Sequence, residues 1–150
     1  MNTPGAESNK DMLVVYIDGG ARGNPGPAGY GVRIEGLDGS LVQELHGALG
    51  ITTNNVAEYN GLLAALRWAV DHGVRDLRIK SDSELLVKQM LGEYRVKHPG
   101  LQPLAAQARL LLMQLGRVSF EHVRREQNAE ADRLSNLAMD EGEKKVKGKR

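Results

Sequence analysis

The sequence of 150 residues contains no cysteine. Disulfides, thiolate metal sites and cysteine nucleophiles are therefore excluded. No apolar stretch approaches the roughly 20 residues that span a bilayer, and the N-terminus MNTPGAESNKDM lacks the charged start and apolar middle of a signal peptide. We therefore expect a cytoplasmic protein that contacts no membrane.

An excess of charge of one sign is also missing. The 20 Lys and Arg nearly balance the 19 Asp and Glu, so no strong basic field indicates nucleic acid binding. The exception is residues 141–150, which carry five Lys or Arg against two Glu. With 41% hydrophobic and 26% charged residues, the chain is typical of one globular domain. We assign 1–11 to a flexible N-terminus, 12–140 to the domain and 141–150 to a basic flexible tail, and we expect a monomer.

Hydrophobic periodicity and turn residues predict an α/β fold. Glycine and proline occupy nearly every other position of GGARGNPGPAGYG, which predicts a loop after the first strand. The sequence GLDG at 36–39 predicts the turn of an antiparallel hairpin. The order β-β-β-α-β-α-α-β-α implies a mixed five-stranded sheet flanked by helices. We expect strands at 13–18, 30–35, 41–49, 77–80 and 118–123, and helices at 55–70, 84–90, 104–115 and 129–139.

Carboxylates lie at several points where a predicted element meets a loop. Asp18 ends the apolar run LVVYID and Asp82 follows LRIKS, so both would emerge at one sheet edge if these strands are parallel neighbours. Glu58 shares the core-facing stripe of its helix, and Asp132 lies in NAEADRLSNLA. A cluster of acids without Cys or paired His favours Mg²⁺ or Mn²⁺ over zinc, and hence a phosphate ester substrate.

Each of these acids also has a structural alternative. The segments with Glu58 and Asp82, NVAE and SDSE, fit helix-capping patterns. Asp132 could favour the positive end of the last helix, and Asp18 before two glycines could make a turn. The glycine-rich segment lacks the Gly-Lys-Ser/Thr ending of a phosphate-binding loop. No single motif therefore distinguishes a catalytic from a structural role.

Taken together, four ordered blocks resemble the type I ribonucleases H. The resemblance covers about residues 13–140, and its blocks are YIDGGARGNPGPAGYGV, TTNNVAEYNGLLAAL, IKSDSELLVKQ and HVRREQNAEADRLSNLA. It implies a ribonuclease H-like sheet and identifies Asp18, Glu58, Asp82 and Asp132 as the catalytic, metal-binding acids.

The resemblance also implies a substrate and a mechanism. The RNA strand of an RNA/DNA hybrid would be hydrolysed with two Mg²⁺ or Mn²⁺ ions roughly 4 Å apart, giving 5′-phosphate and 3′-hydroxyl ends. Asp18 would bridge the ions, Glu58 and Asp82 would each complete one, and Asp132 would hold the other ion more loosely. The residues that resemble the family's nucleic acid contacts are Asn24, Asn54 and Asn55 in the minor groove and Thr53 at the DNA backbone.

The sequence departs from many relatives at two places. It has no basic, tryptophan-rich handle helix, and Tyr94, Arg95, Lys97 and His98 are its only comparable groups. It also lacks the histidine of the loop before the last acid, so Arg124 and Arg125 are the candidates for product release or phosphate contact. His122 alternates with Phe120 and Val118, which predicts a packed strand histidine.

These departures leave other functions open. A nuclease of the same fold could prefer double-stranded RNA or RNA–DNA junctions. A hybrid-binding module without catalysis would be expected to have lost at least one acid, whereas all four are present. The basic tail could contact the nucleic acid backbone, because its cations would release counterions.

Overall fold

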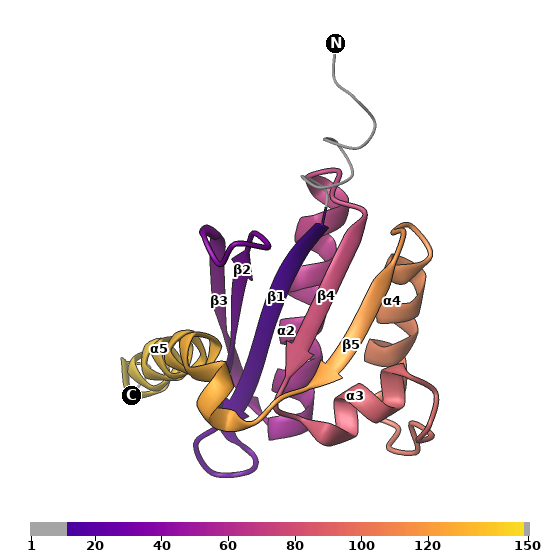
Figure 1. The fold of residues 1–150 in the computed structure, drawn as a ribbon. Helices are drawn as coiled ribbons and strands as arrows, with labels where there is room; N and C mark the ends of the chain where they lie inside the picture. The colour runs from indigo at the N-terminus through magenta and orange to yellow at the C-terminus, as the bar shows by residue number, and fades with distance from the viewer. Residues whose placement is uncertain (1–11, 149–150) are drawn as a thin grey trace.

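A computed structural model describes residues 12–148, which form one five-stranded sheet with helices on both faces (Figure 1). The strand order is β3-β2-β1-β4-β5. β1 is antiparallel to β2 and parallel to β4, which is parallel to β5. This confirms the predicted sheet and element order. The elements are β1 (Met12–Ala21), β2 (Gly26–Glu35), β3 (Leu41–Thr52), α2 (Asn54–Asp71), β4 (Asp76–Ser81), α3 (Glu84–Met90), α4 (Gln102–Leu112), β5 (Val118–His122), the 3-10 helix η1 (Arg125–Asn128) and α5 (Ala129–Gly148).

The two faces of the sheet carry different helices. On one face, α2 packs on β1 and β2, and α4 packs beside α2. On the opposite face, α5 crosses β1, β2 and β3 (Figure 1). On the α2 side, Val15 and Ile17 of β1 are fully buried in one cluster with Leu62 and Leu66. Burial of each such side chain away from water contributes about 1.5–3 kcal/mol to the free energy of folding. These buried contacts therefore fix α2 against the central strand.

Two glycines of β2 allow α5 to approach the sheet closely. A Cβ at Gly31 would lie 2.4 Å from the carbonyl oxygen of Ala131, and one at Gly29 would lie 2.6 Å from the Cβ of Ala138. Any larger residue would push the helix away. Because Gly31 pairs with Asp18 in the ladder, this contact places the start of α5 beside Asp18.

The glycine- and proline-rich segment after Asp18 is not the long loop that we predicted. β1 continues to Ala21 and β2 begins at Gly26, so only residues 22–25 form the turn. Gly23, with φ of 82°, is the one glycine of this segment with a positive φ. Close packing explains the other glycines better than unusual backbone angles: Gly19 lies against α2, Gly20, Gly29 and Gly31 lie against α5, and Gly26 lies against the backbone of the turn.

The C-terminal helix is longer than predicted. We expected a helix to Met139 and a flexible tail from 141, but α5 continues to Gly148. The buried residue Gly142 lies on the side of this extension that faces β3, where an added Cβ would be 3.5 Å from the Ala48 Cβ. The predicted flexible N-terminus, 1–11, lies outside the described residues. Between residues 12 and 148, no helix has the length and apolar character needed to cross a membrane.

Candidate metal centre

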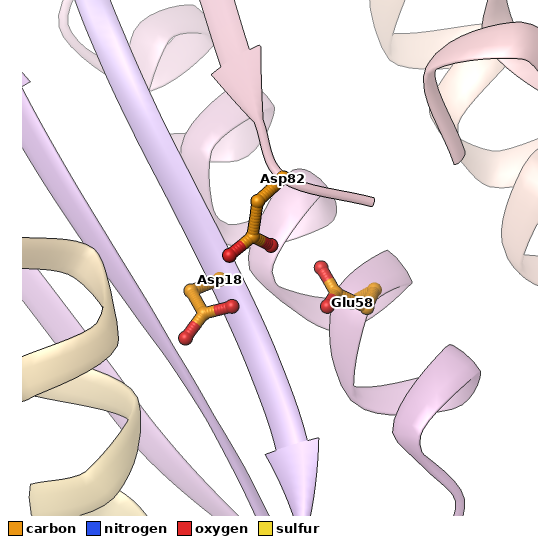
Figure 2. Close-up of side chains that lie close together, drawn as sticks. All are labelled: Asp18, Glu58 and Asp82. Atoms are coloured by element: carbon orange, nitrogen blue, oxygen red, sulfur yellow. The ribbon is translucent and has the colours of Figure 1, made fainter. Parts of the chain in front are cut away.

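Three carboxylates from separate elements point toward one another near the C-terminal ends of β1 and β4 (Figure 2). Asp18 projects from β1, Asp82 directly follows β4, and Glu58 lies on α2. Each offers one oxygen, and these oxygens lie within 4.8 Å of one another. The parallel pairing of β1 with β4, in which Ile17 lies opposite Ser81, brings Asp18 and Asp82 to the same edge.

The helix that carries Glu58 lies unusually close to β1. A Cβ at Gly19 would lie 2.4 Å from the carbonyl carbon of Ala57 and 2.5 Å from the Glu58 nitrogen. Gly61, one turn later on α2, also lies against β1. A Cβ added at Gly61 would be 3.2 Å from the carbonyl oxygen of Asp18. The glycine that follows Asp18 therefore lets the second acid reach the first.

Burial and mutual repulsion disfavour the ionised forms of these acids. Asp18 is 7% exposed and Glu58 is 9% exposed. Burial, with repulsion from Asp82, raises the pKa of Asp18 to about 7, although a hydrogen bond from Ser135 opposes this. Burial, followed by repulsion from Asp18 and Asp82, raises the pKa of Glu58 well above its usual range.

This set of donors fits a hard divalent cation. The Oε2 atom of Glu58 is buried and has no hydrogen-bond partner. A cation among the carboxylates would supply that missing partner and remove the repulsion that raises the pKa values. Ligands that are all carboxylate oxygens suit Mg²⁺ or Mn²⁺ rather than zinc.

Asp132 lies beside the trio of Asp18, Glu58 and Asp82 rather than within it. Its oxygens are not part of the group within 4.8 Å. Asp132 nevertheless lines the same cavity of about 390 Å³ and contributes to the raised pKa of Asp18. The structure thus brings all four predicted acids to one cavity. Other side chains that line it are Arg22, Asn54, Arg125, Ser135, Asn136 and Met139.

Sequence reasoning missed two buried polar residues that support Asp18. Ser135 Oγ donates to Asp18 Oδ2 at 2.8 Å, and it lies 2.9 Å from the carbonyl oxygen of Asp132. Asn128 Nδ2 donates to the carbonyl oxygen of Ile17 at 2.8 Å. Both side chains lie three or four positions from Asp132 in the quoted block NAEADRLSNLA. That helical spacing is the signal that could have identified them.

The predicted nucleic acid contacts gather around the N-terminus of α2. Thr53 caps this helix, because its Oγ1 accepts from Val56 N at 3.2 Å. Asn24 Oδ1 accepts from Asn54 N at 3.0 Å, and Asn54 Oδ1 accepts from the backbone N of Ala21 at 2.7 Å. Asn55 is exposed beside them. The structure brings all four together but gives Asn24, Thr53 and Asn54 local structural bonds as well.

The two candidate arginines differ in position. Arg125 lines the cavity, and its charge lowers the pKa of Glu58 against the larger opposing causes. Arg124 precedes η1 and its backbone N donates to Gln127 Oε1 at 3.1 Å. Arg125 is therefore the better placed of the two to meet a phosphate.

The prediction that His122 is a packed strand histidine is wrong. β5 is an edge strand that ends at this residue, so the side chain is exposed. Its Nε2 lies 3.3 Å from the carbonyl oxygen of Asp82. Val118 and Phe120 on the same face do pack against the core, but this cover ends before His122, the last residue of the strand.

The capping alternatives do not describe Glu58 or Asp82. Side chains of Thr53 and Ser83 cap α2 and α3, so Glu58 lies beyond the first turn and Asp82 precedes the cap. Asp132 does lie in the first turn of α5, where the helix dipole favours an acid. Its position is compatible with both roles.

Two larger cavities lie away from the acids. Volumes of about 580 and 570 Å³ flank Tyr94 and Arg95 in the connection between α3 and α4. Lys88 Nζ lies 4.9 Å from the centre of the Tyr94 ring. The acid cluster, the unpartnered Glu58 oxygen and the raised pKa values all belong to the smaller cavity, which is why we place the site there.

The sequence is similar to that of known proteins over most of its length. A family model described as reverse transcriptase-like matches residues 16–138. The bifunctional protein Rv2228c of Mycobacterium tuberculosis (strain ATCC 25618 / H37Rv) is 50% identical over 129 residues, which are 85% of this chain and 35% of the relative. The chain therefore spans about a third of the length of its mycobacterial relatives.

The fold is similar to solved ribonuclease H structures. The N-terminal ribonuclease H domain of Rv2228c has a TM-score of 0.87 at 46% identity and covers 90% of this chain and 98% of that chain. Ribonuclease H1 of the halophilic archaeon Halobacterium salinarum NRC-1 has a TM-score of 0.83 at 41% identity, with 87% and 98% covered. LC11-RNase H1, isolated from compost and solved in complex with an RNA/DNA hybrid, has a TM-score of 0.82 at 42% identity, with 86% and 97% covered.

Proposed function

Because this chain belongs to the type I ribonuclease H family, we propose that it is an endonuclease that hydrolyses the RNA strand of RNA/DNA hybrids. The observation that carries this proposal is the trio of Asp18, Glu58 and Asp82, whose oxygens converge within 4.8 Å in a cavity. The hybrid bound to the similar LC11-RNase H1 supports the substrate class.

The chain's own residues supply ligands and orientation in this reaction. Two Mg²⁺ or Mn²⁺ ions, when bound, supply the Lewis acidity that activates water and stabilises the leaving 3′ oxygen, which yields 5′-phosphate and 3′-hydroxyl ends. Asp18, which projects from a rigid central strand, would be a ligand shared by the ions, and Glu58 and Asp82 would each complete the ligand set of one of them. Asp132 would hold its ion more loosely, because it lies outside the trio.

The hybrid is recognised beside this centre by neutral amides. Asn24, Asn54 and Asn55 suit the 2′-hydroxyl of RNA in a wide minor groove, because an amide both donates and accepts hydrogen bonds. Thr53 contacts the DNA backbone. The bonds between Asn24, Asn54 and the backbone around them keep these groups in a fixed arrangement at the cavity edge. Such contacts read structure rather than base sequence.

Positive groups outside the trio act on phosphates. Arg125, which lines the cavity, assists the departure of the product phosphate in place of a loop histidine, with Arg124 as a weaker contributor. The basic residues of 144–150 contact the nucleic acid backbone without reading its structure. Lys144 and Lys145 are exposed on the extension of α5, which supports this role.

A second candidate is a nuclease of the same fold that prefers double-stranded RNA or RNA–DNA junctions. The sequence between α3 and α4 has no tryptophan-rich handle for the hybrid, which favours this alternative because a weaker hold on the hybrid could relax the choice of substrate. A catalytically inactive hybrid-binding module ranks lower, because all four acids reach one cavity.

Cleavage of labelled substrates tests the proposal. Hybrid, duplex RNA, duplex DNA and a junction substrate would each be incubated with Mg²⁺ and with Mn²⁺. We expect the hybrid to be cut fastest, with 5′-phosphate ends. Preferential cutting of duplex RNA or the junction would favour the second candidate, and binding of hybrid without cutting would favour the inactive module.

Single substitutions of the acids test the site. Asp18→Asn or Asp82→Asn should abolish hydrolysis while leaving hybrid binding intact, because an amide is isosteric but a poor ligand for Mg²⁺. Asp71→Asn, at an exposed position near the end of α2, is the matched control and should cut normally. Near-normal turnover in Asp18→Asn or Asp82→Asn would remove that residue from the site.

A further inference from the structure

Arg22 lies in the turn between β1 and β2 and lines the acid cavity. Its Nη1 contacts the carboxylates of Asp140 and, at 3.3 Å, Glu143. Its Nη2 lies 3.1 Å from Oδ1 and 3.4 Å from the carbonyl oxygen of Asn136. All three partners belong to α5, so one side chain joins this helix to the turn.

The number of engaged donors indicates what this guanidinium does. An arginine has five N–H donors in a fixed planar fork. Its contacts to Asp140, Glu143 and Asn136 occupy both Nη atoms. Charge-assisted bonds of this kind add geometric definition as well as energy. Arg22 is therefore a clamp on α5, not a cation directed at the acids of the cavity.

The clamp is one link in a chain of hydrogen bonds that crosses the cavity rim. On one side, Asn24 of the turn and Ala21 at the end of β1 are hydrogen-bonded to Asn54 at the start of α2. On the other side, Asn136 Nδ2 donates to the carbonyl oxygen of Asp132 at 2.9 Å. The chain thus connects the helix that bears Glu58 with the helix that bears Asp132.

We propose that Arg22 is a positioning residue that fixes α5, and with it Asp132, relative to the other three carboxylates and so tightens the binding of divalent ions. Asp132 is the acid that α5 carries, whereas Asp18, Glu58 and Asp82 belong to β1, α2 and the end of β4. Its distance from the trio is set by where α5 rests on the sheet. The inference rests on the proposed function in that it takes these acids as the ligands of the ions.

Calorimetric titration of the full chain with Mg²⁺ tests this role without any substrate. Arg22→Ala should raise the Kd for Mg²⁺ roughly tenfold, the lower end of what partners of metal ligands contribute. Arg133→Ala is the matched control, since Arg133 also joins α5 to the sheet, through Glu44 at 2.6 Å, but does not belong to the described cavity lining. Both variants should lower Tm, whereas only Arg22→Ala should lower Mg²⁺ affinity.

A conservative variant separates positioning from simple charge pairing. Arg22→Lys keeps a cation beside Asp140 but cannot present a planar fork to Asn136 as well. It should recover Tm and leave the Kd raised. If Arg22→Ala does not fold, Asp140→Asn breaks the clamp from the other side, with Glu141→Gln on the same helix as its charge-matched control.

Two results would overturn the proposal. One is an unchanged Mg²⁺ affinity in folded Arg22→Ala, and the other is an equal loss of affinity in Arg133→Ala. Hybrid cleavage by the wild type is measured separately. A wild type that bound Mg²⁺ without cutting the hybrid would contradict the proposed function and still allow the two affinities to be compared.

Discussion

Removal of the charge of Asp18 should stabilise the metal-free protein, and more so at higher pH. Burial and repulsion by Asp82 raise the pKa of Asp18 from 3.8 to about 7. The folded carboxyl therefore holds its proton more tightly than the unfolded one. The stability that this protonated carboxyl contributes is fully present below about pH 4 and is lost as the pH rises through about 7. Since one pKa unit corresponds to about 1.4 kcal/mol, the ionised group costs roughly 4 kcal/mol above pH 7.

The pH dependence of this cost can be measured by urea denaturation in the presence of EDTA. At pH 5 the folded carboxyl is still protonated while the unfolded one is mostly ionised, so roughly 1 to 2 kcal/mol of the cost is already present. Asp18→Asn should therefore gain about 2 to 3 kcal/mol more stability at pH 8 than at pH 5. The Ser135 hydrogen bond favours the ionised carboxylate, and its effect is already contained in the pKa of about 7. The difference in stability between the two pH values is therefore the diagnostic quantity.

A control and a ligand sharpen this test. Asp71→Asn, at an exposed acid, should show no gain that depends on pH. Saturating Mg²⁺ should stabilise the wild type at pH 8 and have little effect on Asp18→Asn, because the ion binds only the folded carboxylates. An equal gain at pH 5 and pH 8, or a loss at pH 8, would refute the view that Asp18 is held ionised against burial and repulsion.

Other predictions follow from particular contacts. Gly19→Ala should lower the free energy of unfolding by about 3 kcal/mol, because the new Cβ would meet the backbone of Ala57 at 2.4 Å, and a loss below about 0.5 kcal/mol would contradict this packing. Replacing both Arg124 and Arg125 with alanine should depress steady-state turnover more than single-turnover cleavage, and Arg125→Ala alone should account for most of the lost turnover. Equal effects on both rates would instead place the arginines in the cleavage step. With saturating Mg²⁺, which keeps Asp18 ionised, the activity of the wild type should show no inflection near about pH 6.5, where an ordinary histidine titrates. An inflection there that is lost in His122→Ala would assign the release step to that residue. Deletion of residues 144–150 should weaken hybrid binding at low salt and flatten its salt dependence, and an unchanged salt slope would leave these cations without a role.

Local patterns in the sequence were sufficient for the elements and for the candidate acids. Hydrophobic periodicity and turn residues act over short distances, so strands such as LVVYID and the hairpin at 36–39 could be recognised directly. Asp18, Glu58 and Asp82 were found because each lies where an element begins, ends or turns toward the core. The resemblance of four ordered blocks to ribonucleases H then assigned all of them, with Asp132, to one site.

The distances within the site came from tertiary structure. The parallel pairing of β1 with β4 and the close approach of α2 at Gly19 bring three oxygens together, whereas Asp132 stays beside them. The raised pKa of Asp18 follows from that convergence and from burial, which no local pattern encodes. The support from Ser135 likewise required the position of α5 on the sheet.

Two segments mark the limit of sequence reasoning most clearly. Composition predicted a loop after Asp18 and a flexible tail from 141, yet β1 and α5 extend through parts of both. Each lies against a partner far away in the chain: Arg22 pairs with Asp140, and Gly142 packs where an added Cβ would lie 3.5 Å from the Ala48 Cβ. The sequence by itself determined which side chains could do the chemistry, because propensity and residue type are local properties. Their geometry was decided by packing between distant residues, which exists only in the folded chain.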